Sequence, residues 1–530
     1  MDQADVSEID VSEIKLPEQF NFARHILELN QDRAGKTAYI DDNRKLSYGE
    51  LAQASRRFAA GLKLAGIHRE ERILLVMQDT VDMPVALLGA MLAGIVPVPV
   101  NTLLPAADYS YMLEHSTASA VVVSEALWPV VQEALAALAT QPKIIITGQG
   151  AASVAGALSF ASVLDTAPLA EADFARTRAD DFAFWLYSSG STGRPKGTVH
   201  SHANLFWTAE LYGKPVLGVR ESDLVFSAAK LFFAYGLGNA LTFPLSVGAT
   251  TVLMPERPTP PAVFKRLTEH RPTVFCGVPT LYVAMLASDE LPAKEQVALR
   301  ICASAGEALS REVGERFHHH FDCHILDGLG STEMLHIFLS NREGDVHYGS
   351  TGRPVPGYQL ELRDDNGHAV PNGEIGDLYI RGPSAALLYW ANREKSRSTF
   401  VGDWVKSGDK YSIDADGYYT YAGRSDDMLK VSGQYVSPIE VESALMGHDS
   451  VLECAVIGVP DADGLTKTKA FVVLRHPESA CGELEDDLKK FVKSRLAPHK
   501  YPRDISFVQL LPKTATGKIQ RFKLRAAEGH

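Results

Sequence analysis

Residues Tyr187–Gly197 of this 530-residue chain read YSSGSTGRPKG. They follow an apolar and aromatic run, Phe182–Leu186, that predicts a strand. The backbone N–H groups and hydroxyls of the loop, together with the ammonium group of Lys196, can surround phosphate oxygens. A Walker A loop would need Ser or Thr after its lysine, but Gly197 follows and Pro195 precedes, so a P-loop kinase is disfavoured. A plain Gly/Ser linker is the alternative interpretation. We predict a strand followed by a phosphate-binding loop that is not a P-loop.

Around this loop, short β-branched runs alternate with helical patterns. The runs expected as strands are 72–77, 120–124, 143–147, 250–254 and 273–276, and the segments expected as helices are 48–65, 84–93, 261–270 and 310–321. Apolar strands separated by amphipathic helices predict stacked α/β layers with largely parallel sheets.

The composition of the sequence changes after about residue 340, where glycine and proline become frequent. This pattern predicts a small β-rich subdomain over 341–425. The polar, turn-prone stretch Gly423–Asp427 (GRSDD) follows, and beyond it we expect strands at 451–459 and 470–474 and a helix at 482–494. We therefore predict an N-terminal domain over 1–425 and a small α+β C-terminal domain over 426–530, with the boundary at Asp426.

The chain carries 52 basic and 65 acidic side chains, a formal net charge of −13. Because nucleic acids and anionic membranes are held by clustered Lys and Arg, this balance argues against a general binder of either. The basic residues are concentrated near the end, since Lys489–Arg525 contains eleven of them and a single acidic residue, Asp504. We expect this segment to meet small polyanionic ligands.

Targeting and membrane signals are weak. Five scattered cysteines without a Cys-x-x-Cys pair indicate neither a disulfide framework nor a zinc site. The acidic stretch Met1–Glu18 lacks a signal-peptide pattern. Met83–Val100 has 18 residues without a charge, but it contains Pro84, Pro97 and Pro99. We interpret it as a buried helix followed by a buried strand, and we expect a cytoplasmic protein with no membrane partner.

The loop 187–197 resembles the phosphate-binding signature of the acyl-adenylate-forming (AMP-binding) superfamily, which comprises acyl-CoA synthetases, luciferases and peptide-synthetase adenylation domains. Further signatures follow in the family's order: GEAL (306–309), DGLGSTE (327–333), SGD (407–409), GRSDDMLK (423–430) and PKTATGK (512–518). One such motif would be weak, but six in order are specific. The resemblance implies ATP, Mg²⁺ and coenzyme A as cofactors and a C-terminal domain that moves.

The resemblance also implies a nucleotide site. Phosphate contacts are expected from Ser188, Ser189, Gly190, Ser191, Thr192, Gly193 and Lys196, and adenine or ribose contacts from Gly306, Glu307, Ala308, Asp327, Gly328, Leu329, Asp409 and Arg424. Leu329 departs from the family's usual aromatic residue, so adenine would pack on an aliphatic surface. Thr332 and Glu333 are expected at the nucleotide, with Glu333 holding Mg²⁺ as an oxygen ligand. Standing alone, the same Thr-Glu pair would more simply begin a helix.

Lys518 matches the family's essential C-terminal lysine. A cation that bridges the carboxylate and the α-phosphate offsets the repulsion between the two reacting anions. Asp426 matches the hinge about which the C-terminal domain rotates between adenylation and thioester formation, and the loop with Lys430 and Gly433 would then approach the thiol. The family is also known for acetylation of this lysine, which would remove its charge. A lysine acetyltransferase that acts on Lys518 is therefore a candidate partner.

The carboxylate pocket is expected at Lys230–Gly238 (KLFFAYGLG), where peptide-synthetase domains carry an aspartate for the substrate's amino group. This segment has no acid, and Phe233, Ala234, Tyr235 and Gly236 suit a flat apolar acid. Burial of the two aromatic residues in the core is equally compatible. The resemblance adds Gly330, His336 and Ile337 to the pocket. The sequence segments FFAYG, SAGEAL and SGQYVSP are most similar to those of benzoate and hydroxybenzoate-CoA ligases, so we predict an aryl-carboxylate CoA ligase.

Several alternatives stay open at this point. A medium-chain fatty acyl-CoA ligase, a stand-alone carboxylate-adenylating enzyme or a luciferase-like oxygenase would share the nucleotide motifs. A non-catalytic nucleotide sensor is the alternative of a different class. Only twelve residues follow Lys518, so we expect free coenzyme A rather than a carrier segment as the acceptor. The sequence carries no signal for oligomeric state, although homodimers are common among relatives.

Overall fold

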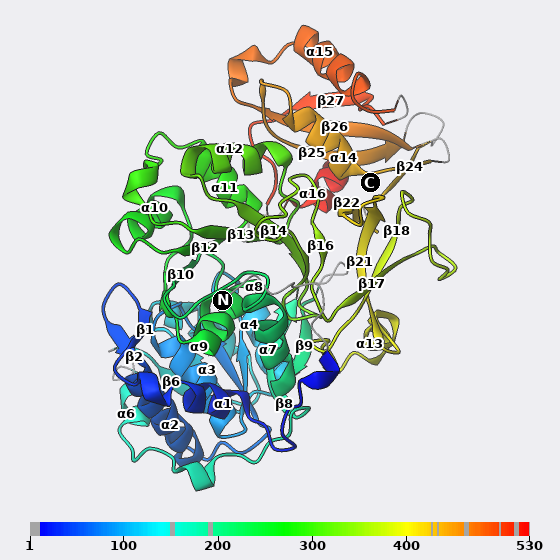
Figure 1. The fold of residues 1–530 in the computed structure, drawn as a ribbon. Helices are drawn as coiled ribbons and strands as arrows, with labels where there is room; N and C mark the ends of the chain where they lie inside the picture. Colours follow the sequence, from blue (N-terminus) through cyan, green and yellow to red (C-terminus); the bar gives the residue numbers. More distant parts are fainter. Residues whose placement is uncertain are drawn as a thin grey trace.

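The computed structural model describes residues 11–148, 154–188, 194–425, 428–431, 434–460, 466–497, 500–513 and 519–528. Figure 1 shows two stacked α/β regions, a β-rich part beside them and the C-terminal elements at one end. The expected α/β layers are thus confirmed. Each strand and helix predicted in the first 330 residues lies within two residues of its predicted bounds.

The first sheet is wholly parallel. Its strands run in the order β4 (Val96–Pro99), β3 (Arg72–Val76), β5 (Ala120–Val123), β6 (Lys143–Ile146) and β7 (Leu158–Ser159). Helix α2 (Tyr48–Leu64) begins with a capping box in which Ser47 and Glu50 satisfy each other's backbone N–H groups. It packs with the buried helix α3 (Asp82–Leu92) in one hydrophobic cluster.

The uncharged stretch that ends at Val100 forms α3 and then β4, as expected. Every residue of α3 from Met83 to Leu92 is buried, and so is every residue of β4. In the part of the chain that the structure describes, no helix combines the length and the apolar character that crossing a membrane requires.

The second sheet has nine strands. They run in the order β16 (Arg353–Pro354), β15 (Ile337–Ser340), β14 (Ile325–Gly330), β13 (Ile301–Ala305), β12 (Val274–Gly277), β10 (Leu224–Ser227), β11 (Thr250–Val252), β1 (Thr37–Ile40) and β2 (Lys45–Ser47). The strands from β14 to β1 in this order are parallel, so their carboxyl ends share one edge. Side chains of α10 (Pro260–Glu269), α11 (Pro279–Leu286) and α12 (Arg311–Phe321) join its hydrophobic cluster.

A small antiparallel sheet brings distant segments together. Strand β9 (Lys196–Ser201) lies between β8 (Phe182–Ser188) and β19 (Leu388–Tyr389). Ser188 pairs with Lys196 across β8 and β9, so the two described ends of the glycine-rich segment face each other. This sheet places the start of β9 beside Tyr389.

The β-rich subdomain follows the expected pattern. It consists of β17 (Gln359–Arg363), β18 (Gly376–Arg381), β20 (Phe400–Val401), β21 (Trp404–Ile413) and β22 (Tyr419–Arg424), with the helix α13 (Arg393–Thr399). β21 is the central strand, because β18, β20 and β22 all pair with it.

The C-terminal part has its own hydrophobic clusters, formed within residues 429–524. Its elements are β23 (Leu429–Val431), β24 (Gln434–Val436), α14 (Pro438–Met446), β25 (Val451–Pro460), β26 (Thr466–Leu474), α15 (Gly482–Lys493), β27 (Asp504–Phe507) and α16 (Arg521–Ala527). β26 begins four residues earlier than predicted, because it pairs along its whole length with β25. Asp426 lies outside the described residues, so the boundary at that position stays a prediction.

Candidate active site

The turn between β14 and β15 carries Thr332 and Glu333. It does not begin a helix, so the simpler interpretation of the Thr-Glu pair is wrong. The chain reverses directly into the antiparallel strand β15, and backbone contacts hold the turn: His200 Nε2 lies 2.8 Å from the carbonyl oxygen of Thr332, and the Ala386 N–H donates to the carbonyl oxygen of Glu333 at 2.7 Å. Both side chains are therefore placed on a loop at the carboxyl edge of the sheet.

Glu333 faces a tyrosine and a lysine from the small antiparallel sheet. The hydroxyl of Tyr389 donates to Glu333 Oε1 at 2.7 Å, and Lys196 Nζ lies 3.9 Å from the same oxygen. Lys196 Nζ also lies 3.3 Å from the Tyr389 hydroxyl and 4.4 Å from its ring centre. Burial lowers the pKa of Lys196, and the charge of Glu333 opposes that shift. The structure thus places Lys196, the first residue of β9, beside Glu333, the predicted metal ligand.

Asp409 and Arg424 are neighbours across the β21–β22 ladder. Arg424 Nη1 lies 3.1 Å from Asp409 Oδ1; the carboxylate is buried, whereas the Arg424 side chain is 47% exposed. Gly408 has a φ of +78°, and a Cβ there would lie 3.0 Å from Arg424 Nη2. The left-handed backbone conformation within β21 therefore favours glycine at this position. The two residues predicted to contact ribose therefore lie next to each other.

The expected adenine walls are only partly open. Gly306 and Ala308, which follow β13, are exposed, and Glu307 between them is partly buried. On β14, Leu329 and Gly330 are partly buried, but Asp327 and Gly328 are buried. Burial raises the pKa of Asp327 well above its usual value, although the N–H groups of Leu309 and Gly328 act against this.

The expected carboxylate pocket gathers around α8 (Ala234–Leu237). Phe233, Ala234 and Tyr235 are partly exposed, whereas Gly236, His336 and Ile337 are buried. His336 Nε2 lies 3.2 Å from the carbonyl oxygen of Tyr235, and its ring centre lies 5.6 Å from that of Tyr235. Two glycines beside these residues allow close packing, Gly236 against the backbone and Gly238 against His336. A Cβ at Gly236 would lie 2.0 Å from the Lys230 carbonyl oxygen, and one at Gly238 would lie 2.3 Å from His336 Cδ2.

Two buried polar atoms at this pocket lack a protein partner among the described residues. They are the Tyr235 hydroxyl and His336 Nδ1. Burial lowers the pKa of His336 to about 3, so its imidazole is neutral at ordinary pH. Its Nε2 donates to the Tyr235 carbonyl, which leaves Nδ1 as an acceptor. The residues expected to line the pocket therefore retain hydrogen-bonding capacity beside their apolar and aromatic surface.

Three residues at these sites were not found from the sequence. Tyr389 comes from a two-residue strand and belongs to no motif. Tyr212 lies in a π-helix (Ala209–Gly213), and its ring centre is 5.2 Å from that of His336. Asp79 follows β3; its carboxylate oxygens accept the Leu231 N–H at 3.3 and 3.1 Å and so hold the start of the pocket segment. Burial raises the pKa of Asp79 to about 6. For Asp79, the only sequence signal was an acid soon after a predicted buried strand.

Some predicted residues lie outside the described part of the chain. These are Ser189, Gly190, Ser191, Thr192, Gly193, Asp426, Gly433 and Lys518. Ser188 ends β8, and Lys430 lies on β23, where it pairs with Tyr435. The roles assigned to all of these residues stay predictions.

The single carboxylate of Glu333 fits only a metal site that is completed by the substrate. Within the ranges described, no group of three or more His, Cys, Asp or Glu residues could hold a metal ion. Mg²⁺ at a nucleotide, however, is usually bound by one or two carboxylates together with substrate phosphates and water. Glu333 offers one such carboxylate, whose side chain is 16% exposed. The donor set fits an ion that arrives with the nucleotide.

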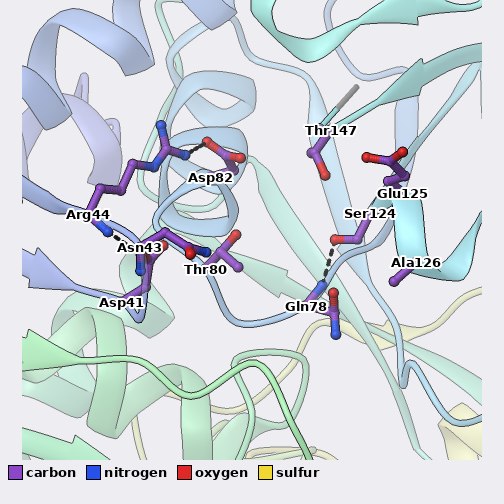
Figure 2. A pocket seen from close by; sticks show the side chains of 11 residues that line it. Asp41, Asn43, Arg44, Gln78, Thr80, Asp82, Ser124, Glu125, Ala126 and Thr147 are labelled. Atoms are coloured by element: carbon purple, nitrogen blue, oxygen red, sulfur yellow. Dashed lines mark hydrogen bonds and ion pairs between the residues drawn. The ribbon is translucent and has the colours of Figure 1, made fainter. Parts of the chain in front are cut away.

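A separate polar cavity of about 420 Å³ lies elsewhere, at the carboxyl ends of β3, β5 and β6. Figure 2 shows Gln78 and Ser124 on one side and the Arg44–Asp82 ion pair on the other. It shares no residue with the sites above.

Comparisons with known proteins place these sites in context. A family model described as AMP-binding enzyme matches residues 28–390, and one described as AMP-binding enzyme C-terminal domain matches residues 440–518. A benzoate–CoA ligase of Thauera aromatica is 55% identical over 518 residues, which are 97% of each chain. A 4-hydroxybenzoate–CoA/benzoate–CoA ligase of Rhodopseudomonas palustris is 50% identical over 93% of this chain and 91% of its own.

Two solved structures are also similar to this chain over nearly its whole length. A benzoate CoA ligase from Burkholderia xenovorans has a TM-score of 0.89 at 64% identity, covering 96% of this chain and all of the other. The anthranilate CoA ligase AuaEII, solved with anthranoyl-AMP, has a TM-score of 0.93 at 42% identity, covering 98% of this chain and 99% of its own.

Proposed function

Because the chain belongs to the AMP-binding enzyme family, we propose that it ligates a benzoate-like aryl carboxylate to coenzyme A with consumption of ATP. The observation that carries the choice of substrate is the pocket around Tyr235. Its partly exposed wall, Phe233 to Tyr235, is aromatic and small, and the facing His336 is neutral. No acid stands in this segment to receive an amino group, which disfavours amino acids.

The proposed reaction has two steps. In the first, a carboxylate oxygen attacks the α-phosphorus of ATP and pyrophosphate leaves, which gives the acyl-adenylate. In the second, the thiol of coenzyme A attacks the acyl carbon and AMP leaves, with the thiol proton passing to solvent or a base. Lys518 is the proposed cation that bridges the two anions in the first step.

The described residues have distinct roles in this scheme. Asp409 accepts hydrogen bonds from the ribose hydroxyls, with its side chain oriented by Arg424 at 3.1 Å. Lys196 places a positive charge beside the phosphates, and Tyr389 holds the Glu333 carboxylate through its 2.7 Å hydrogen bond. Glu333 would hold Mg²⁺, which would neutralise phosphate charge when bound. Phe233 and Tyr235 pack against the aryl ring.

The test is a panel of carboxylates scored for CoA-dependent AMP formation. Benzoate and its ring-substituted relatives should rank first. If medium-chain fatty acids rank higher, the pocket assignment is wrong. Carboxylate-dependent pyrophosphate release without CoA turnover would instead favour a stand-alone adenylating enzyme.

The sensor alternative has its own test. Nucleotide binding with no AMP formed from any carboxylate would favour it, and so would a Lys518→Ala variant with unchanged behaviour. Three further proposals go beyond the family assignment: a homodimer, acetylation of Lys518 by a lysine acetyltransferase, and a cytoplasmic location. Chromatography with light scattering, and mass spectrometry under acetylating conditions, test the first two.

A further inference from the structure

Asp377 on β18 is a buried carboxylate outside the sites described above. It is 4% exposed, and three groups converge on it. The Ser425 hydroxyl donates to Oδ1 at 2.7 Å, Lys410 Nζ lies 3.0 Å from the same oxygen, and Lys406 Nζ lies 3.2 Å from Oδ2. A buried charge needs such partners.

The partners of Asp377 are neighbours of the proposed ribose contacts. Lys410 follows Asp409 on β21, and Ser425 follows Arg424 at the end of β22. The Ser425 N–H also donates to the carbonyl oxygen of Gly408 at 2.9 Å. The hairpin that presents the proposed ribose contacts is thus fastened, one residue further along each strand, to the same carboxylate. Ser425 directly precedes Asp426, the predicted hinge.

Charge balance alone does not require the serine. Burial by itself would raise the pKa of Asp377, but the hydrogen bonds from Ser425 and Lys410 and the two lysine charges outweigh it, so the pKa lies below its ordinary value. The carboxylate is therefore ionised, and two lysines already stand beside it. What the hydroxyl adds is a fixed position for Ser425 through a charge-assisted hydrogen bond.

Toward the C-terminal part, the Met428 N–H donates to the Arg424 carbonyl oxygen at 3.1 Å, and β22 presents a glycine to α14. Gly423 has a φ of +132°, and a Cβ there would lie 3.3 Å from Met428 Sδ, 3.9 Å from Pro438 Cδ and 4.0 Å from Ser437 Oγ. β22 is therefore anchored firmly to β18 and β21 but meets α14 across a residue without a side chain.

We propose that Asp377 is a positioning residue that fixes Ser425 to the N-terminal domain and thereby confines domain rotation to the residues after it. This inference rests on the proposed function, because it presupposes alternation between adenylation and thioester formation. Without the anchor, the pivot extends back into β22, and the end position of the rotating domain is less well defined.

The two half-reactions depend unequally on this anchor. During adenylation, ATP and the proposed Lys518 contact link the two domains and help to hold their orientation. After pyrophosphate has left and Lys518 has withdrawn, that bridge is lost, and the domain must reach its second position before coenzyme A can link it to the N-terminal domain. This rotation depends on the pivot. Loss of the anchor should therefore slow thioester formation more than adenylation.

The experiment measures both half-reactions in the full-length enzyme with benzoate as the probe substrate. Pyrophosphate exchange reports adenylation, and single-turnover reaction of preformed benzoyl-adenylate with coenzyme A reports thioester formation. Ser425→Ala should lower the second rate at least about tenfold relative to the first, the lower end of the scale of one lost charge-assisted hydrogen bond. Ser425→Thr should restore most of the loss. Thr420→Ala, an exposed position on the same strand, is the matched control and should leave the ratio unchanged.

Asp377→Asn keeps an acceptor for Ser425 but loses the charge, so it should shift the same ratio. The double variant with Ser425→Ala should shift it no further than the stronger single variant. Parallel loss of both half-reactions together with a lower Tm would mean that the cluster is only structural and would overturn the proposal, as would an unchanged ratio. A wild-type enzyme that forms no AMP from any aryl carboxylate would instead contradict the proposed function.

Discussion

Replacement of Asp409 by asparagine should weaken ribose binding much more than it lowers the folding stability of the free enzyme. The Asp409–Arg424 pair spans 3.1 Å, but the arginine is 47% exposed. Ion pairs of this kind contribute about 0.2–1 kcal/mol, so the variant should lose little folding stability. The same carboxylate is buried, and its hydrogen bonds to a bound ligand are shielded from water.

The effect on nucleotide binding should be much larger. Hydrogen bonds to a charged acceptor contribute about 1.5–3 kcal/mol each, and neutral ones about 0.5–1.5 kcal/mol. Two ribose hydroxyls facing an amide instead of a carboxylate should together lose about 2–3 kcal/mol, or roughly 30- to 150-fold in Kd. The Tm of the nucleotide-free enzyme should move little.

Calorimetric titration with AMP and 2′-deoxy-AMP provides the assay. In the wild type, removal of the 2′-hydroxyl should weaken binding about tenfold or more, but in Asp409→Asn only a few-fold. Asp403→Asn, an exposed carboxylate paired with Arg381 at 3.0 Å, is the control and should bind both nucleotides as the wild type does. An equal loss for the deoxy nucleotide in wild type and variant would refute the assignment of Asp409 to ribose.

Three further changes have defined expectations. Lys518→Ala should lower benzoate-dependent pyrophosphate exchange by about a hundredfold or more, yet leave the reaction of preformed benzoyl-adenylate with coenzyme A largely intact; loss of both would contradict the proposed division of labour. Tyr235→Phe removes a buried hydroxyl that has no partner among the described residues, so thermal unfolding of the free enzyme should show a stabilisation of about 1–3 kcal/mol, and a lower Tm would mean that the hydroxyl is satisfied. Burial lowers the pKa of His202 to about 3, so the unfolded chain takes up a proton below its pKa of about 6.5 that the folded protein does not. Stability is therefore lost as pH falls through 6.5, and between pH 7 and 5.5 urea unfolding of His202→Gln should lose about 1.3 kcal/mol less than the wild type; an equal loss would contradict burial of a neutral imidazole.

The sequence predicted the α/β layers because buried parallel strands are short, apolar and bounded by helices. The run 120–124 contains β5 for that reason, and all four residues of β5 are buried. The motif residues Asp409 and Arg424 were also found, although their pairing was not. That pairing arises from the β21–β22 register, which a linear pattern does not contain.

Residues brought in by long-range contacts could not be found in this way. Tyr389 reaches Glu333 from 56 positions away, because its two-residue strand pairs with β9. Asp377 looks like an isolated acid on an ordinary strand, and only the converging Lys410 and Ser425 set it apart. Hydrogen-bonding partners that come from different strands leave no periodic signal.

The charge of the C-terminal segment shows why counting residues is insufficient. Eleven basic side chains against one acid suggested a surface that meets polyanions, but much of this charge is compensated by acids from earlier in the same domain. Ion pairs join Lys489 to Glu485, Lys500 to Glu440, Lys513 to Glu453 and Arg521 to Glu442. In contrast, Lys493 and Arg503 each lie 4.0 Å from the ring centre of Tyr501, and Arg495 lies 3.6 Å from that of Phe491. A cation over an aromatic ring keeps its full charge. Among the described residues of this segment, the cations around Tyr501 and Phe491 therefore keep charge that the four ion-paired residues share with acids of their own domain.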